Sequence, residues 1–177
     1  LIVFLGAIII CISVLIPINN NKEIEVLGKV ENVTNSIIPK PLTYKGNKGK
    51  FIINKDTTIF VNGKNETETE EIGKIAKYLK EKLKPATGYD FNINKNQNTK
   101  QNYIYLTTLE GNEELGNEGY EITTTSDGIK IIANEPEGLF RGIQTLRQLL
   151  PPEIAKPTLV NNIEWSVPNS EIYDKPE

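Results

Sequence analysis

Two apolar stripes at helical spacing, set among short runs typical of β-strands, constrain the fold of this chain more than any other feature. The apolar positions are Ile72, Ile75, Ala76, Leu79 and Leu83 in the first stripe, and Leu139, Ile143, Leu146 and Leu150 in the second. Residues three and four apart lie on one face of a helix, so each stripe predicts an amphipathic helix. Pro85 with Gly88 ends the first helix, and Pro151-Pro152 ends the second.

Local signals also suggest where each helix begins. Thr67 and Glu70 have the spacing of a capping box, which places the start of the first helix there. Asn134 is the expected N-cap of the second helix, with Pro136 in its first turn.

The segments around the stripes are rich in β-branched and aromatic residues and predict strands. The expected strands are residues 50–54, 57–61, 91–94, 103–107, 120–125 and 129–133. The last two flank Ser126-Asp127-Gly128, which is a hairpin turn with glycine where positive φ is needed. This order of elements predicts an α+β fold with two helices packed on a mostly antiparallel sheet.

Length and missing residue types exclude several classes of function. A (β/α)₈ barrel needs about 250 residues, and this chain has 177. The chain has no histidine, and its single cysteine is Cys11, so His-based catalysis, thiolate clusters and the usual zinc sites are excluded. The net charge of −3 gives no sign of the basic surface that nucleic-acid binding requires. We therefore expect no metal, no cofactor and no nucleic-acid partner.

The first residues differ in character from the rest. Residues 1–18 are apolar except for Ser13, a pattern that predicts either a signal peptide or a membrane anchor. Residues 19–36 are polar and predict a linker. We expect the globular domain to span residues 37–155, followed by an exit segment, 156–177. A protein with such a leader is exported, and is either extracellular or held at the cell surface.

Candidate site residues are few. The acidic runs Glu66–Glu71 and Glu113–Glu114 are interpreted as solvated and structural. Four long polar side chains share the second helix with its apolar stripe: Arg141, Gln144, Arg147 and Gln148. Two interpretations of these four stay open. They form either a solvated helix face or a docking surface for a neighbouring domain, since arginine pairs well with carboxylates and carbonyls.

Three stretches of the chain resemble a known protein family. They are Gly119-Tyr120-Glu121-Ile122, the run from Asp127 to Ala133, and Glu137-Gly138-Leu139-Phe140-Arg141-Gly142-Ile143-Gln144-Thr145-Leu146-Arg147-Gln148-Leu149-Leu150-Pro151. They are similar to the domain that precedes the barrel in β-N-acetylhexosaminidases of glycoside hydrolase family 20. Ile38-Pro39-Lys40-Pro41 resembles the opening of that domain. Trp165, Val167-Pro168 and Ile172-Tyr173-Asp174-Lys175-Pro176 resemble its passage into the barrel.

The resemblance implies a two-part enzyme whose (β/α)₈ barrel removes terminal N-acetylglucosamine or N-acetylgalactosamine by substrate-assisted catalysis. The family's catalytic pair is an Asp-Glu dipeptide in the barrel, and no aspartate here is followed by glutamate. No catalytic residue therefore carries over, and the resemblance implies that Asp174 and Pro176 position the chain. Glu177 departs from the family, which often has arginine there. The family's domain is also likened to zinc proteases without their metal centre.

The resemblance makes the chain's own barrel the expected partner, with glycan bound only through that barrel and membrane contacted through residues 1–18 if these are not cleaved. Two alternatives stay open. One is the similar domain of family 84 N-acetylglucosaminidases and hyaluronidases. The other is a membrane-tethered module that binds sugar or protein, which the single tryptophan disfavours because sugar-binding faces usually present exposed aromatic rings.

Overall fold

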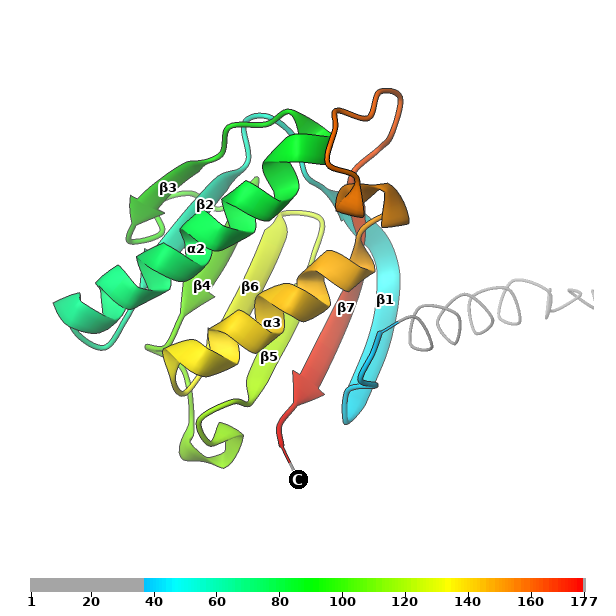
Figure 1. Ribbon diagram of the computed structural model, residues 1–177. Helices are drawn as coiled ribbons and strands as arrows, with labels where there is room; N and C mark the ends of the chain where they lie inside the picture. The colour runs from blue at the N-terminus through cyan, green and yellow to red at the C-terminus, as the bar shows by residue number, and fades with distance from the viewer. Residues whose placement is uncertain (1–36, 177) are drawn as a thin grey trace, which may run out of the picture.

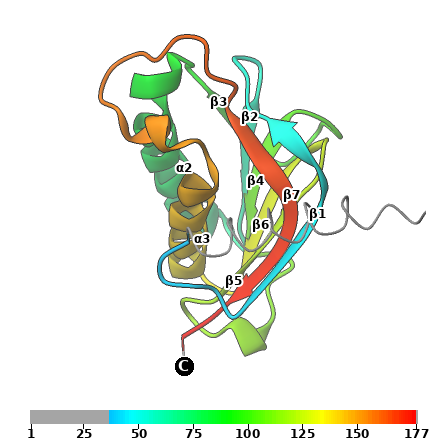
Figure 2. The ribbon, with the colours of Figure 1, turned by 90° about the vertical axis from the view of Figure 1, so that its right-hand side faces the viewer.

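The computed structural model describes residues 37–176, which form one sheet covered on a single face by two helices (Figures 1 and 2). The predicted leader, 1–18, and linker, 19–36, lie outside the described residues. The strands are β1 (Thr43–Ile52), β2 (Thr58–Asn62), β3 (Asn92–Lys95), β4 (Tyr103–Thr107), β5 (Tyr120–Thr124), β6 (Gly128–Ala133) and β7 (Ser166–Asp174). The helices are α2 (Glu66–Thr87) and α3 (Pro136–Leu149), with 3₁₀ turns η1 (Glu113–Leu115) and η2 (Pro152–Ala155).

The α+β class is confirmed, but the prediction of a mostly antiparallel sheet is wrong, because the sheet is mixed. In the described part of the chain the seven strands lie in the order β1-β7-β5-β6-β4-β2-β3. The β1–β7, β7–β5 and β5–β6 pairs are antiparallel, and the β6–β4, β4–β2 and β2–β3 pairs are parallel. Parallel pairs need a crossover connection, and α2 provides one between β2 and β3. The second helix likewise connects β6 to β7, which run in the same direction with β5 between them.

The N-cap of helix α2 lies two residues before the expected cap, Thr67. Asn65 is the N-cap, and its side-chain oxygen accepts the Glu68 N–H at 2.9 Å. Thr69, one turn further on, donates its hydroxyl hydrogen to the Asn65 carbonyl at 2.8 Å. The helix continues through Pro85 and ends at Gly88, whose φ of 72° is the left-handed conformation that favours glycine. Its apolar stripe is buried against β2, β3 and β4.

Helix α3 begins at Pro136, after Glu135 rather than after the expected Asn134. Neither side chain caps the helix by a hydrogen bond. The Asn134 side-chain oxygen instead accepts a hydrogen bond from the Lys64 ammonium at 3.2 Å. Leu139, Ile143 and Leu146 are fully buried against the sheet. Burial of one such side chain stabilises a fold by about 1.5–3 kcal/mol, so this stripe is a main part of the core.

The first and last strands pair with each other. Strand β7 lies between β1 and β5, in the middle of the antiparallel half of the sheet (Figure 2). The β1–β7 register runs from Thr43 opposite Tyr173 to Ile52 opposite Ser166, with an irregularity between Gly46 and Lys50. Residues 156–177, expected to lead out of the domain, thus contribute a strand to its sheet before the chain reaches Pro176.

Candidate functional site

The four polar residues singled out on the second helix lie on the outward side of α3, the side away from the sheet. The helix sits close to the sheet because Gly142 has no side chain: a β-carbon there would lie 2.6 Å from Ile131 Cγ2. With the apolar stripe buried, Arg141 is exposed, and Gln144, Arg147 and Gln148 are each partly exposed. The structure therefore brings the four together on one face, and gives them two kinds of contact.

Arg141 and Gln148 make contacts within the domain. The Arg141 Nη2 atom lies 3.1 Å from Glu118 Oε2, in an exposed ion pair. The Gln148 amide is fixed more firmly, because its Oε1 accepts the Ile38 N–H at 2.8 Å and its Nε2 donates to the Ile38 carbonyl at 3.1 Å. This amide therefore holds the segment that leads into β1 against the helix.

Gln144 and Arg147 contact each other. The Arg147 Nη1 atom donates to Gln144 Oε1 at 2.8 Å. Their remaining inner donors, Gln144 Nε2 and Arg147 Nε, are shielded from solvent and have no acceptor among residues 37–176. A shielded donor without an acceptor is costly, so the inner side of this pair is unfavourable as it stands.

A pocket of about 470 Å³ lies beside this face, where the leading segment and the end of β7 meet. We call it the junction pocket; the residues that matter here are Ile38, Leu42, Arg141, Gln144, Gln148 and Pro176. It joins residues from both ends of the described chain. Asp174, the last residue of β7, lines the pocket together with the two residues that follow it. Figure 1 shows the end of the chain directly after β7.

The floor of the junction pocket is a chain of hydrogen bonds among Tyr120, Thr145 and Asp174. The Tyr120 hydroxyl lies 2.6 Å from Thr145 Oγ1 and donates to Asp174 Oδ2 at 3.3 Å, so the threonine donates to the tyrosine. Asp174 Oδ1 also accepts the Leu42 N–H at 3.2 Å. Burial raises the pKa of Tyr120 to about 12, and the nearby Asp174 carboxylate adds to the rise, while the bond from Thr145 opposes it.

Sequence reasoning missed Tyr120 and Thr145 as members of this cluster. They lie 25 residues apart in the sequence and come from a strand and a helix, so no local pattern joins them. The resemblance to the family did single out Asp174. The other sequence signal for this cluster was Thr145, a polar residue among the otherwise apolar residues that α3 buries.

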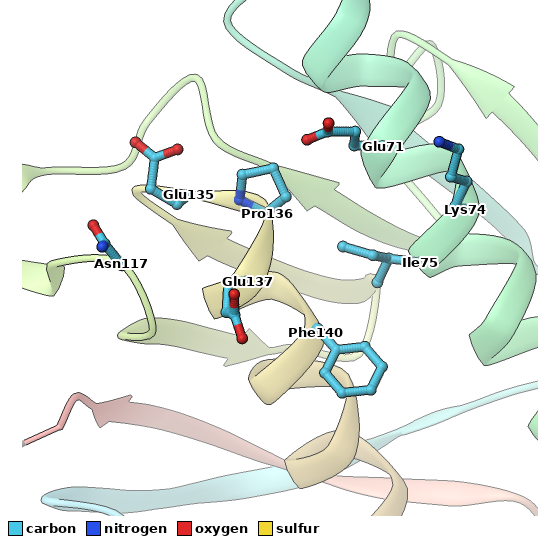
Figure 3. A pocket seen from close by; sticks show the side chains of 8 residues that line it. All are labelled: Glu71, Lys74, Ile75, Asn117, Glu135, Pro136, Glu137 and Phe140. Carbon is cyan, nitrogen blue, oxygen red and sulfur yellow. The ribbon is translucent and has the colours of Figure 1, made fainter.

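A second hollow, of about 630 Å³, lies between α2 and the first turn of α3 (Figure 3). Carboxylates of Glu71, Glu135 and Glu137 line it together with the Phe140 ring. Glu135 lies 3.4 Å from the Lys64 ammonium, and Glu137 lies 3.9 Å from Arg141 Nη2. Glu71 and Glu137 are exposed, and Glu135 and Glu137 are paired with cations, so these carboxylates are ordinary surface groups.

The acidic runs are solvated except at one position. Glu66 pairs with Lys95, and Glu113 and Glu114 lie in the exposed turn η1. The interpretation is wrong for Glu68, which is only 8% exposed because its carboxylate turns back to accept the Lys64 N–H at 2.7 Å ahead of the helix. Within residues 37–176, no three His, Cys, Asp or Glu side chains are arranged to hold a metal ion. No helix in that range is long and apolar enough to cross a membrane.

Comparison with known proteins gives a consistent result. Residues 34–175 match the family described as glycosyl hydrolase family 20, domain 2. A β-hexosaminidase of Porphyromonas gingivalis (strain ATCC BAA-308 / W83) is 31% identical over 175 residues, which are 97% of this chain and 21% of that protein. This chain therefore spans about a fifth of the length of that curated relative.

Solved structures agree. The family 20 β-N-acetylhexosaminidase of Streptomyces coelicolor A3(2) is 32% identical with a TM-score of 0.69, over 82% of this chain and 27% of that one. The N-acetyl-β-hexosaminidase of Streptomyces plicatus, solved in complex with Thio-NAglucal, matches the same shares at 32% identity with a TM-score of 0.70. The resemblance noted from the sequence is thus confirmed.

Proposed function

This chain belongs to glycosyl hydrolase family 20, as a domain of the type called domain 2, and we propose that it is the N-terminal supporting domain of an exported β-N-acetylhexosaminidase. The observation that carries the proposal is the match of residues 34–175 to the family, together with 31% identity to a β-hexosaminidase over nearly the whole chain. Export is supported by the apolar run at residues 1–18, which has the composition of a leader.

The proposed enzyme hydrolyses terminal, non-reducing N-acetylglucosamine or N-acetylgalactosamine residues of glycans or chitooligosaccharides. We assign its chemistry to a separate barrel domain, because the present sequence contains no Asp-Glu dipeptide. The role we assign to residues 37–176 is mechanical: they form a folded layer against which the barrel packs. The zincin-like shape that the resemblance implies is part of the same proposal.

The α3 face is the part of the domain that we propose contacts the barrel. Gln144 and Arg147 are partly exposed on this face, and a neighbouring domain offers backbone carbonyls and carboxylates to such side chains. Arg141 adds an exposed guanidinium at the same face.

A sugar-binding module is the weaker proposal. Its binding face would present aromatic rings to solvent, whereas the large exposed apolar side chains among residues 37–176 are all isoleucine or leucine. Trp165 is only 2% exposed and belongs to the core.

Hydrolysis of a chromogenic N-acetylglucosaminide tests the proposal. We expect no hydrolysis by this 177-residue chain and hydrolysis by the product of the gene extended downstream. Activity in the short chain would place the chemistry in residues assigned here to structure. Inactivity of both, with specific retention of the short chain on a glycan array, would favour the binding module instead.

A further inference from the structure

The turn between β2 and α2 contains the one Asn-Gly dipeptide of the sequence, Asn62-Gly63. Glycine has no side chain to shield its backbone nitrogen, which makes this pair the most reactive of the asparagine dipeptides in deamidation. The fold requires glycine at position 63, because a β-carbon there would lie 2.7 Å from the Thr69 backbone nitrogen and 2.9 Å from the Glu68 carbonyl carbon. The close seating of α2 on the end of β2 therefore builds a chemically labile pair into the domain.

Deamidation starts from the backbone nitrogen of the residue that follows asparagine. The Gly63 nitrogen gives up its proton to solvent and attacks Asn62 Cγ; a C–N bond forms, and the Cγ–Nδ2 bond breaks as ammonia leaves with a proton returned by solvent. The product is a cyclic succinimide. Water then adds to either ring carbonyl and opens the ring, which leaves aspartate or isoaspartate at position 62. The reaction needs water, a free Gly63 N–H, and a backbone in which this nitrogen meets Cγ.

The structure holds the groups of this reaction in unreactive positions. The Gly63 N–H donates to Thr69 Oγ1 at 2.9 Å, in a buried contact. The Asn62 Nδ2 atom donates to Asn96 Oδ1 at 3.0 Å, and the Asn62 carbonyl accepts the Thr108 N–H at 3.2 Å. Asn62 is also the last residue of β2, and extended backbone carries the next nitrogen away from the side-chain carbonyl.

Thr69 is the most important of these partners, because its hydroxyl ties the Gly63 N–H to α2. The hydroxyl accepts from Gly63 and donates to the Asn65 carbonyl at 2.8 Å. Thr69 is only 6% exposed, so solvent does not reach this contact in the folded chain. The Gly63 nitrogen becomes available when the first turn of α2 separates from the end of β2, and local opening of this kind is in equilibrium with the native state.

We propose that Asn62-Gly63 is the modification site at which this domain ages chemically, and that Thr69 suppresses the reaction in the folded chain. Isoaspartate at position 62 adds one main-chain atom between β2 and α2, which displaces Gly63 from its seat against the helix. Modification therefore loosens the contact that delays it. This chemistry is independent of the hydrolytic activity proposed above.

Peptide mapping by mass spectrometry measures deamidation at position 62 during incubation in mildly alkaline buffer. The 177-residue chain is compared with a synthetic peptide of residues 59–66, in which no fold protects the pair. We expect the folded chain to deamidate more slowly than the peptide by about tenfold or more, since the rate follows the population of the open turn. Equal rates in the two would overturn the proposal.

Thr69→Val separates the Thr69 contact from general stability. Thr87→Val is the matched control, because the Thr87 hydroxyl makes the same kinds of bond at the other end of α2: it donates to the Leu83 carbonyl at 2.9 Å and accepts the Tyr89 N–H at 3.1 Å. We expect Thr69→Val to speed deamidation by about two- to tenfold, as the loss of one hydrogen bond implies, and Thr87→Val to keep the parent rate. Equal acceleration by both variants would refute the role of Thr69.

Asn96→Gly tests the protection of the pair without a change in α2. Asn96 has a φ of 59°, which glycine adopts readily, so the substitution removes only the amide that holds the Asn62 side chain. Circular dichroism at the incubation temperature verifies that each variant is folded. We expect Asn96→Gly also to speed deamidation. Acceleration by Asn96→Gly without acceleration by Thr69→Val would assign the protection to the side-chain amide and refute the role of Thr69.

Discussion

At the scale of single residues, Tyr120 has the most consequential position. Its ring is 4% exposed in the layer between sheet and α3, and its hydroxyl is the central link between Thr145 and Asp174. Buried hydroxyls need partners, and here they come from a helix and from the neighbouring strand. The tyrosine thereby ties α3 to the end of β7, where the chain leaves the domain.

Replacing Tyr120 by phenylalanine should lower the free energy of unfolding by about 1–2 kcal/mol, because it leaves a buried threonine hydroxyl without its partner. Urea denaturation of the 177-residue chain measures the change. Tyr103→Phe is the control, since the Tyr103 hydroxyl makes no hydrogen bond to residues 37–176, and it should have little effect. Equal effects of the two variants would show that the cluster does not stabilise the domain.

The raised pKa of Tyr120 adds a pH dependence. Since the pKa of Tyr120 in the folded chain is about 12 and the ordinary pKa of tyrosine is about 10, the neutral phenol is favoured by folding. Its stabilisation is fully present below pH 10 and is lost as pH rises from about 10 to 12. The difference in unfolding free energy between the parent chain and Tyr120→Phe should therefore shrink over that range; a difference that grows there would contradict the assigned pKa.

At the scale of elements, the close approach of α3 to the sheet depends on a glycine. Gly142→Ala should lower the free energy of unfolding by about 1–3 kcal/mol, because the new methyl group would lie 2.6 Å from Ile131 Cγ2. Gly73→Ala in α2 is the matched control, since nothing lies within 4 Å of its β-carbon position. That change should raise the free energy of unfolding by about 0.5–1 kcal/mol, as alanine is the better helix former. Thermal unfolding of both variants checks the opposite signs.

The outward face of α3 gives a prediction for the extended enzyme. If these arginines form the proposed charge-assisted hydrogen bonds to the barrel, changing Arg141 and Arg147 together to alanine should lower its unfolding free energy by about 1–3 kcal/mol. Lys45→Ala is the control. It breaks an exposed ion pair with Glu171, on the other face of the sheet, and should change little. Unchanged thermal stability of the double variant would remove α3 from the interface.

Elements with local signals were predictable, and elements defined by distant partners were not. The helices and the β5–β6 hairpin follow from spacing within a few residues, and the structure has both. The caps were misplaced because Asn65 and Thr67 are both suitable residues, and only tertiary contacts decide between them. Strand β7 was not expected as a strand because it contains Pro168 and several polar residues, and its partners lie far away in the sequence.

At the scale of the whole molecule, the candidate site is a product of topology. The α3 residues were identified from the sequence because they share one helix face. The junction pocket could not be predicted, since Leu42 and Asp174 are 132 residues apart and meet only because β1 pairs with β7. The mixed sheet was missed for the same reason: strand direction depends on how α2 and α3 cross over the sheet, which composition does not encode.

The pairing of β1 with β7 also sets an order of events during synthesis. In the described part of the chain, β1 lies at the sheet edge with β7 as its neighbour. The first strand to leave the ribosome therefore has no strand to pair with until the last one has emerged. Until residue 174 has emerged, β1 has no neighbouring strand in the described part of the chain, β5 has one open side, and the floor of the junction pocket lacks its carboxylate. In the proposed enzyme, the supporting domain therefore completes its sheet only after its last strand has emerged, and the barrel segments that follow meet a surface that has only just formed.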